Sequence, residues 1–159
     1  MGGARGASRR HSQSVQELDP NLLGPLAGGR SSRIGHAGNE GLVFFKRRNR
    51  YYLGFGGLSC FGRQGSNVAI WSSEHPLGPY NASGDIMPSA AWSAQSDAVF
   101  FVGAPGDADA DLVLYGDRWQ SAPDGLKSHD FTYMTPIRFH DNGSVVSVTA
   151  FESNVTINY

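Results

Sequence analysis

The hydrophobic positions of this chain occur in short runs that are separated by turns, and few stretches follow a helical spacing. The clearest example is an apolar run at 42–45, followed by a basic turn around Asn49 and a second, aromatic run at 51–55. Two short β-rich runs joined by a turn of this length predict a β-hairpin. Glu40 and Gly41 come directly before the first strand, so the pattern places a carboxylate at the start of the hairpin.

The same pattern predicts further strands and the loops between them. Strands are expected at 12–18, 67–72, 98–101, 112–116, 131–139 and 144–151. Loops and connections are expected at 21–35, 58–66, 74–80, 81–92, 103–109 and 117–130, where Gly, Pro, Ser, Asn and Asp gather. Residues 1–10 are mostly Gly, Ala and Arg and are expected to form a disordered N-terminus, and Cys60 is expected to be a small buried hydrophobe.

Two parts of the chain repeat one pattern about fifty residues apart. The apolar run at 98–101 matches that at 42–45, and the run at 112–116 matches that at 51–55. Repeated units of several short strands predict an all-β fold of the β-propeller type, although a β-sandwich also has regularly spaced strands.

The chain supplies about two blades of such a propeller, at 40–80 and 95–151, and one strand of a third at 12–18. A propeller needs roughly four to eight blades, so we expect the chain to be the C-terminal part of a larger propeller or an incomplete gene product. Two blades alone leave apolar sheet faces uncovered, and self-association is a second way to cover them.

Composition supports the all-β interpretation and excludes several classes of partner. The 159 residues suffice for one domain with a core, and only 17% of them are charged while 21 are Gly. The 13 basic and 14 acidic residues give a net charge of -1, so neither nucleic acid nor a membrane surface is expected as a partner. No apolar run is long enough to span a membrane. Residues 1–10 lack the apolar core of a signal peptide, and the localisation stays open.

Several residues are candidates for a chemical role. Glu40 stands at the start of a strand, which is a common location for a catalytic carboxylate and also for an ordinary solvated Glu. Trp119 beside Asp117 and Arg118 can supply the aromatic face and the hydrogen-bonding groups that bind a sugar, although such residues are more often a core Trp and a structural ion pair. His129 is not part of a metal-ligand pattern, so neither a metal nor another cofactor is expected.

Several motifs resemble the fourth blade of glycoside hydrolase family 43. They are Asn39-Glu40-Gly41 before an apolar strand, Phe45-Lys46, the strand Arg50-Tyr51-Tyr52-Leu53, and 64–68 followed by 76–80. The stretches 115–119 and 121–125 are most similar to the branch that contains the exo-acting galactan 1,3-β-galactosidases, and His11 to Leu23 resembles the connector between the third and fourth blades. The resemblance covers about residues 11–150, with one departure at Leu42, where the family often has Pro.

The resemblance implies a five-bladed propeller, of which 11–159 are the C-terminal blades, and hydrolysis of glycosidic bonds with inversion. It assigns Glu40 as the general acid. Inversion needs a second group, with the two carboxyl groups roughly 6.5–9.5 Å apart. In most members that base is an Asp of the first blade, and a further Asp tunes the acid; the chain contains neither. The galactanase-like branch carries instead a Gln that opens the fifth blade, which is Gln95 here.

Gln95 is therefore expected to orient a water molecule through its amide, since an amide cannot accept a proton as a carboxylate does. An ordinary polar residue at the start of a strand is an equally good interpretation, and Asp97 is the neighbouring alternative. The resemblance implies an oligo- or polysaccharide substrate and secretion. Two other hypotheses remain: a carbohydrate-binding propeller without turnover, and an inactive gene fragment. In each case we expect the chain alone to have little or no glycosidase activity.

Overall fold

The computed structural model describes residues 13–28, 31–34, 39–57, 62–87, 93–104, 107 and 110–148. The predictions for residues 1–10 and for Cys60 fall outside these ranges. Within them the chain forms nine β-strands and one short 3-10 helix, Lys127–His129. The all-β prediction is confirmed. No helix in the described ranges has the length and apolar character needed to cross a bilayer.

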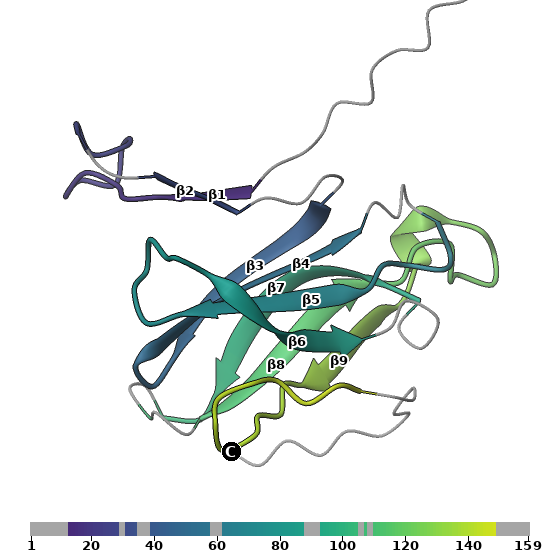
Figure 1. Ribbon diagram of the computed structural model, residues 1–159. Coiled ribbons are helices and arrows are strands. Elements are labelled where there is room, and N and C mark those ends of the chain that lie inside the picture. The colour runs from purple at the N-terminus through teal and green to yellow at the C-terminus, as the bar shows by residue number, and fades with distance from the viewer. Residues whose placement is uncertain are drawn as a thin grey trace, which may run out of the picture.

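The strands form three antiparallel sheets in which consecutive strands are neighbours (Figure 1). A two-stranded sheet pairs β1 (Gln13–Gln16) with β2 (Ser31–Ile34). A four-stranded sheet consists of β3 (Asn39–Arg47), β4 (Arg50–Gly57), β5 (Val68–Ser73) and β6 (Asn81–Met87). A three-stranded sheet consists of β7 (Gln95–Val102), β8 (Asp111–Asp117) and β9 (Thr132–Pro136).

The predicted hairpin around Asn49 is the first pair of the four-stranded sheet. Its last register pair is Arg47 with Arg50, which leaves two residues in the turn, and Arg48 there has a φ of 51°. A positive φ is what a two-residue hairpin turn requires for the strands to keep their twist. Behind the turn Phe45 pairs with Tyr52, and their rings stack at a centroid distance of 5.1 Å. The second predicted hairpin is likewise present, as β7 and β8.

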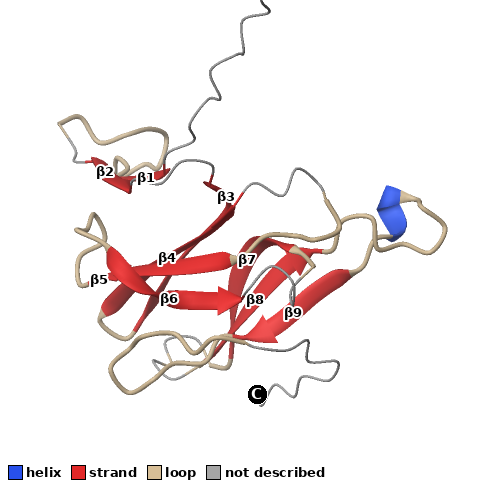
Figure 2. Ribbon diagram, turned by 45° about the vertical axis from the view of Figure 1, so that its right-hand side comes forward, coloured by secondary structure: helices blue, strands red, loops and turns tan. Residues whose placement is uncertain are grey.

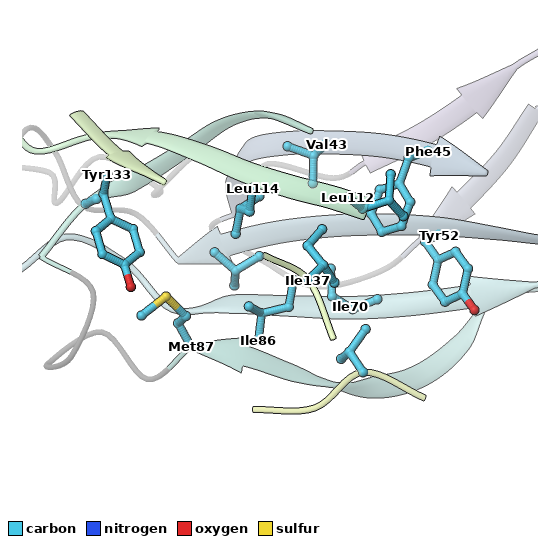
Figure 3. Close-up of a cluster of buried hydrophobic side chains, with 13 residues drawn as sticks. Val43, Phe45, Tyr52, Ile70, Ile86, Met87, Leu112, Leu114, Tyr133 and Ile137 are labelled. Atoms are coloured by element: carbon cyan, nitrogen blue, oxygen red, sulfur yellow. The ribbon is translucent and has the colours of Figure 1, made fainter. Parts of the chain in front are cut away.

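The main core lies between the four-stranded and the three-stranded sheet, and Figure 3 shows its side chains pointing into that space. The alternation of each strand places every second residue on this face. Tyr52 is 1% exposed, and its hydroxyl donates a hydrogen bond to the Gly143 carbonyl at 2.9 Å. Burial raises the pKa of the Tyr52 phenol, so this donor stays protonated at neutral pH. The buried members are Val43, Phe45, Tyr52, Val68, Ile70, Ile86, Met87, Ala94, Leu112, Leu114, Tyr133, Ile137 and Val145.

The opposite face of the four-stranded sheet is covered by the β1–β2 pair. Ile34 is buried there with Leu53, Phe55 and Tyr80, and Val15 packs against them. The strand predicted at 12–18 is thus present as β1. The loop predicted at 21–35 is wrong for its last residues, because 31–34 form β2, which pairs with the otherwise open edge of β1.

The connection predicted at 81–92 is wrong for its first seven residues, which form β6. Asn, Ser, Gly and Asp have weak β-propensity, which is why the pattern missed the strand. Gly84 has a φ of 110°, and the pairing with β5 shifts register twice, so the strand is irregular. Burial of Ile86 and Met87 at its end outweighs the weak propensity.

The strand predicted at 144–151 is also wrong over its described part, 144–148, which forms only an isolated bridge between Val145 and Phe139. Beyond the turn at 141–143 the chain crosses to the other sheet. The amide of Val145 donates to the Ser83 carbonyl at 3.1 Å, and that of Val148 to the Ile86 carbonyl at 2.6 Å. Val145 reaches the main core from there, and this burial favours the crossing over a fourth strand beside β9.

One face of the three-stranded sheet is apolar and partly exposed. We call it the outer face; its members share a side by cross-strand register and are Ala98, Phe100, Val113, Tyr115, Met134 and Pro136, of which Val113 is buried. Phe100 is 37% and Met134 44% exposed. Contiguous apolar surface of this kind is typical of a contact surface rather than of solvent-facing sheet.

We therefore expect the chain to self-associate through the outer face as its concentration rises. Met134→Lys should weaken the association about tenfold, because it places a charge in an apolar contact. Sedimentation velocity over a concentration series measures this. Leu126→Lys is the matched control, since Leu126 is 54% exposed but lies in the loop before the 3-10 helix. A wild-type chain that stays monomeric throughout the series would contradict the expectation.

Candidate functional site

The first residues of β3 and β7, which are the first strands of their sheets, meet at one end of the molecule (Figure 1). Each strand has a bulge there, between Glu40 and Val43 in β3 and between Ser96 and Ala98 in β7. Bulges re-aim side chains and are frequent beside functional sites. The Ser96 hydroxyl is buried and donates a hydrogen bond to the Gly41 carbonyl at 2.5 Å, which ties the starts of β3 and β7 together.

Gly41 is required at this crossing for two reasons. Its φ is 62°, a conformation that residues with a Cβ rarely adopt. A Cβ added there would lie 2.6 Å from the Ser96 carbonyl oxygen and 2.8 Å from its hydroxyl. The glycine therefore allows β3 to approach β7 closely enough for the side chains on either side to meet.

A chain of hydrogen bonds joins three of the residues that the sequence singled out. Trp119 Nε1 donates to Gln95 Oε1 at 3.1 Å, and Gln95 Nε2 donates to Glu40 Oε2 at 3.2 Å. An indole nitrogen can only donate, so the amide oxygen must face Trp119 and the amide nitrogen must face the carboxylate. The arrangement orients the Gln95 amide and holds the half-buried Glu40 side chain at the start of β3.

The pairing register makes a different residue the counterpart of Glu40 in the repeat. Glu40 lies opposite Gly56, and Ser96 lies opposite the corresponding Gly116. Gln95, one position earlier, corresponds by register to Asn39. The predicted alignment of 42–45 with 98–101 agrees with this register, whereas that of 51–55 with 112–116 is displaced by one residue. Gln95 stands one position before the counterpart of Glu40, yet it is the residue whose side chain contacts Glu40.

Trp119 stands in a loop, 118–131, that is closed by Asp130. The Asp130 carboxylate accepts hydrogen bonds from the backbone amides of Ala122 at 2.9 Å and Gln120 at 3.0 Å. Lys127 Nζ lies 3.3 Å from the same carboxylate and 3.9 Å from the centroid of the Trp119 ring. Figure 2 shows this loop, with its short helix, between β8 and β9. Asp130 and Lys127 thus hold the indole in position.

Sequence reasoning missed both Lys127 and Asp130. In the sequence Asp130 stands beside His129 and suggests only a possible metal ligand, but His129 Nδ1 contacts Asp124 Oδ2 at 2.6 Å instead. In the described part of the chain no three His, Cys, Asp or Glu side chains come together as a metal site would require. The spacing of eight residues between Ala122 and Asp130 could have indicated this role, because a loop that folds back on itself can bring an Asp side chain to a backbone amide at that distance in the sequence.

The remaining candidates lie beside this chain of hydrogen bonds. Asp117 ends β8 opposite Gln95, and its Oδ2 lies 3.9 Å from Lys127 Nζ. The Arg118 amide donates to the Phe131 carbonyl at 2.9 Å, so the loop closes onto β9. Asp97 sits in the bulge of β7, where desolvation, followed by the charge of Asp117, raises the pKa of its carboxyl.

A hollow of about 490 Å³ opens next to Trp119. We call it the Trp119 hollow; it is lined by Arg63, Ser93, Arg118, Trp119, Gln120, Ser121, Ala122, Pro123 and Phe131. A second hollow, of about 470 Å³, includes Arg50 and Glu74 in its lining. Arg50 follows the β3–β4 turn, so this second hollow lies at the opposite end of the strands from Glu40.

We expect Asp130→Asn to loosen the Trp119 loop. The hydrogen bonds from Ala122 and Gln120, with Lys127, hold the pKa of Asp130 below its usual range, so the carboxylate is charged at neutral pH. Its contribution to stability is present above the ordinary carboxyl pKa and is lost as the pH falls through the lowered one. Thermal unfolding and the emission maximum of Trp fluorescence measure the effect at pH 7 and at acid pH.

Asp124→Asn is the control for this loop. Asp124 carries a lowered pKa through its hydrogen bonds from Leu126 and His129, whereas the amides of Gln120 and Ala122 donate to Asp130. A red shift of emission in the Asp130 variant alone supports the described role. Equal effects of both substitutions would mean that Asp130 does not position Trp119.

No protein-family model and no curated protein sequence matches the chain. Its fold matches part of the propeller of glycoside hydrolase family 43 enzymes of known structure. A family 43 β-1,3-galactosidase bound to galactodeoxynojirimycin matches with a TM-score of 0.65 and 17% identity, over 84% of this chain and 37% of that one. The exo-β-1,3-galactanase of Phanerochaete chrysosporium with galactose matches with 0.65 and 22%, over 85% and 29%. That of Clostridium thermocellum matches with 0.64 and 20%, over 83% and 28%.

The chain therefore spans about a third of the length of the enzymes it matches. At these identities the likeness establishes the fold, and the predicted partial propeller is confirmed. The Phanerochaete enzyme has also been solved with β-1,3-galactotriose, in a variant in which one Glu is replaced by Gln.

Proposed function

We propose that this chain carries part of the active site of a propeller glycosidase that hydrolyses β-1,3-linked galactosides with inversion. The observation that carries the proposal is the Gln95–Glu40 hydrogen bond where β3 and β7 begin side by side. The ligands of the matched enzymes, which are galactodeoxynojirimycin, galactose and β-1,3-galactotriose, support the substrate class.

Glu40 acts as the general acid. Its proton passes to the glycosidic oxygen as the bond between that oxygen and the anomeric carbon breaks, and a water molecule attacks the anomeric carbon from the opposite face. The Gln95 amide helps to orient this water, since an amide both donates and accepts hydrogen bonds. Trp119 acts as a positioning residue, because its indole fixes which side of the amide faces Glu40.

The attacking water must also lose a proton, which an amide cannot accept. Inverting glycosidases hold the accepting base roughly 6.5–9.5 Å from the acid. We propose that this base comes from another part of the propeller, because the chain spans only about a third of the matched enzymes. Asp117, Arg118 and Trp119 contribute to the sugar site on this side.

A carbohydrate-binding propeller without turnover is the second candidate. It is favoured by the two hydrogen-bonding ends of Gln95, which are both directed at protein groups, Glu40 and Trp119. An inactive gene fragment is the third. The second candidate predicts binding of the saccharide without hydrolysis, and the third predicts neither binding nor hydrolysis. The first candidate predicts hydrolysis, so an assay of hydrolysis separates it from the other two.

The test is hydrolysis of β-1,3-galactan and of aryl β-galactosides, followed by proton NMR of the first-formed sugar. For the chain within its complete propeller we expect the α-anomer first, which is the inverted product. For the 159-residue chain alone we expect little or no turnover. A complete propeller that binds galactan without releasing sugar would favour the second candidate, and a β-anomer product would refute inversion.

A further inference from the structure

We propose that the Trp119 hollow is a subsite for a sugar residue that carries an anionic oxygen group, either a carboxylate or a sulfate ester. The inference rests on the proposed function, since a sugar held there would belong to the same saccharide that Glu40 cleaves. It adds a substrate class, acidic saccharides, to the neutral galactosides proposed above.

The hollow adjoins the proposed catalytic residues through one side chain. Trp119 lines it, and the same indole donates its hydrogen bond to Gln95, which contacts Glu40. Its volume of about 490 Å³ lies within the roughly 300–1,000 Å³ of small-molecule pockets. A saccharide bound at Glu40 therefore has a second recognition site within reach of its neighbouring units.

The lining of the hollow carries positive charge. Arg63 and Arg118 both line it, and among its described lining residues none is acidic. A guanidinium group presents its N–H donors in a planar fork that matches the two oxygens of a carboxylate or a sulfate. Such pairs are stronger than the bonds that arginine makes to neutral sugar hydroxyls.

The nearby carboxylates, Asp117 and Asp130, are not among the residues that line the hollow. The Asp130 side chain is only 4% exposed and is engaged by two backbone amides and Lys127. Asp117 faces the same lysine, with Oδ2 3.9 Å from Nζ. Lys127 thus offsets part of their negative charge, and the charged side chains in the lining itself are Arg63 and Arg118.

The rest of the lining suits a sugar ring rather than a small inorganic anion. Trp119 and Phe131, the latter 51% exposed, present aromatic surface, and aromatic faces pack against the C–H groups of sugars. Ser93 and Ser121 add hydroxyl groups. Aromatic surface together with arginine therefore favours an acidic sugar over free phosphate or sulfate.

The test is a calorimetric or NMR titration of the full chain with four probes. They are neutral β-1,3-galactotriose, the same trisaccharide bearing a glucuronic acid branch, the same bearing a sulfate ester, and inorganic sulfate. At low salt we expect one or both acidic trisaccharides to bind about tenfold tighter than the neutral one, and inorganic sulfate to bind weakest. The difference in affinity between the acidic and the neutral trisaccharides should become smaller in 0.5 M NaCl, because salt screens exposed charges.

Arg63→Gln carries the mutational test, since Arg63 is exposed and its replacement should leave the fold intact. We expect it to remove most of the preference for the acidic probes while affinity for the neutral trisaccharide changes less than twofold. Arg138→Gln is the matched control; Arg138 is also exposed but follows the far end of β9. Arg118→Gln should act like Arg63→Gln if its thermal unfolding is unchanged.

Equal affinity for the acidic and neutral trisaccharides would overturn the inference, as would an Arg138→Gln effect as large as that of Arg63→Gln. Inorganic sulfate binding as tightly as the sulfated sugar would reduce the site to an adventitious ion only and overturn it too. Which acidic trisaccharide binds tighter identifies the anionic group. Failure of the complete propeller to hydrolyse galactan would refute the proposed function alone, because this titration measures no turnover.

Discussion

Replacing Glu40 with Gln is expected to lower the rate of β-1,3-galactan hydrolysis by the complete propeller about 10²–10⁴-fold, which is what positioned proton transfer contributes. Gln has nearly the shape of Glu and can still meet the Gln95 amide, so the fold should not change. The natural leaving group is a sugar hydroxyl, which leaves poorly without a proton. Aryl galactosides whose leaving group is an acidic phenol need no such proton, so their rate of hydrolysis should fall much less.

The measurement is kcat/KM on both substrate types for the wild type and the variant. Glu74→Gln is the matched control, because Glu74 lies at the opposite end of the strands with 78% of its side chain exposed. We expect it to leave both rates unchanged. A Glu40→Gln protein that keeps its full rate on galactan would remove the general-acid role from Glu40.

Gly41→Ala is expected to lower the melting temperature by roughly 2–12 °C, because a non-glycine residue at positive φ costs about 1–3 kcal/mol. A further cost arises because the new Cβ would meet the Ser96 carbonyl oxygen at 2.6 Å, and backbone cannot move aside cheaply. The same displacement should separate Glu40 from Gln95. The variant should therefore lose both stability and the site's hydrogen bond.

Gly125→Ala separates the cost of the positive φ from the cost of the steric clash. Gly125 has a φ of 74°, but an added Cβ would find nothing within 4 Å. It should show the cost of backbone strain without the clash. Thermal unfolding measures both variants, and the side-chain amide resonances of Gln95 report the contact with Glu40. If Gly41→Ala unfolds no earlier than Gly125→Ala and leaves those resonances in place, the close approach of β3 and β7 is not essential.

The sequence predicted those parts of the fold in which local pattern and tertiary contact agree. The hairpin around Asn49 has apolar runs, a turn and paired aromatic rings at compatible positions, so it was found. In β6 the local propensity is weak, and only the pairing with β5 and the burial of Ile86 make it a strand. Such an element is visible only once the partner strand is known.

The candidate site divides in the same way. Glu40 is identified from its place before a strand, Gln95 from the family resemblance, and Trp119 from its aromatic ring beside Asp117 and Arg118. The structure brings the three side chains into one chain of hydrogen bonds. Lys127 and Asp130 were not identified, since their role depends on how loop 118–131 folds back on itself. Their contribution comes from tertiary geometry that has no short sequence motif.

The crossing of 145–148 to β6 has a consequence for the order in which the protein folds during synthesis. The Ser147 hydroxyl donates to the Asp85 carbonyl, a contact between residues 62 positions apart. At about 5–20 residues per second a ribosome needs roughly 3–12 s to add that length. Until then the emerging β6 has an open edge, which other nascent chains can pair with. Chaperone protection of this edge during translation should therefore raise the yield of the protein more than protection after release.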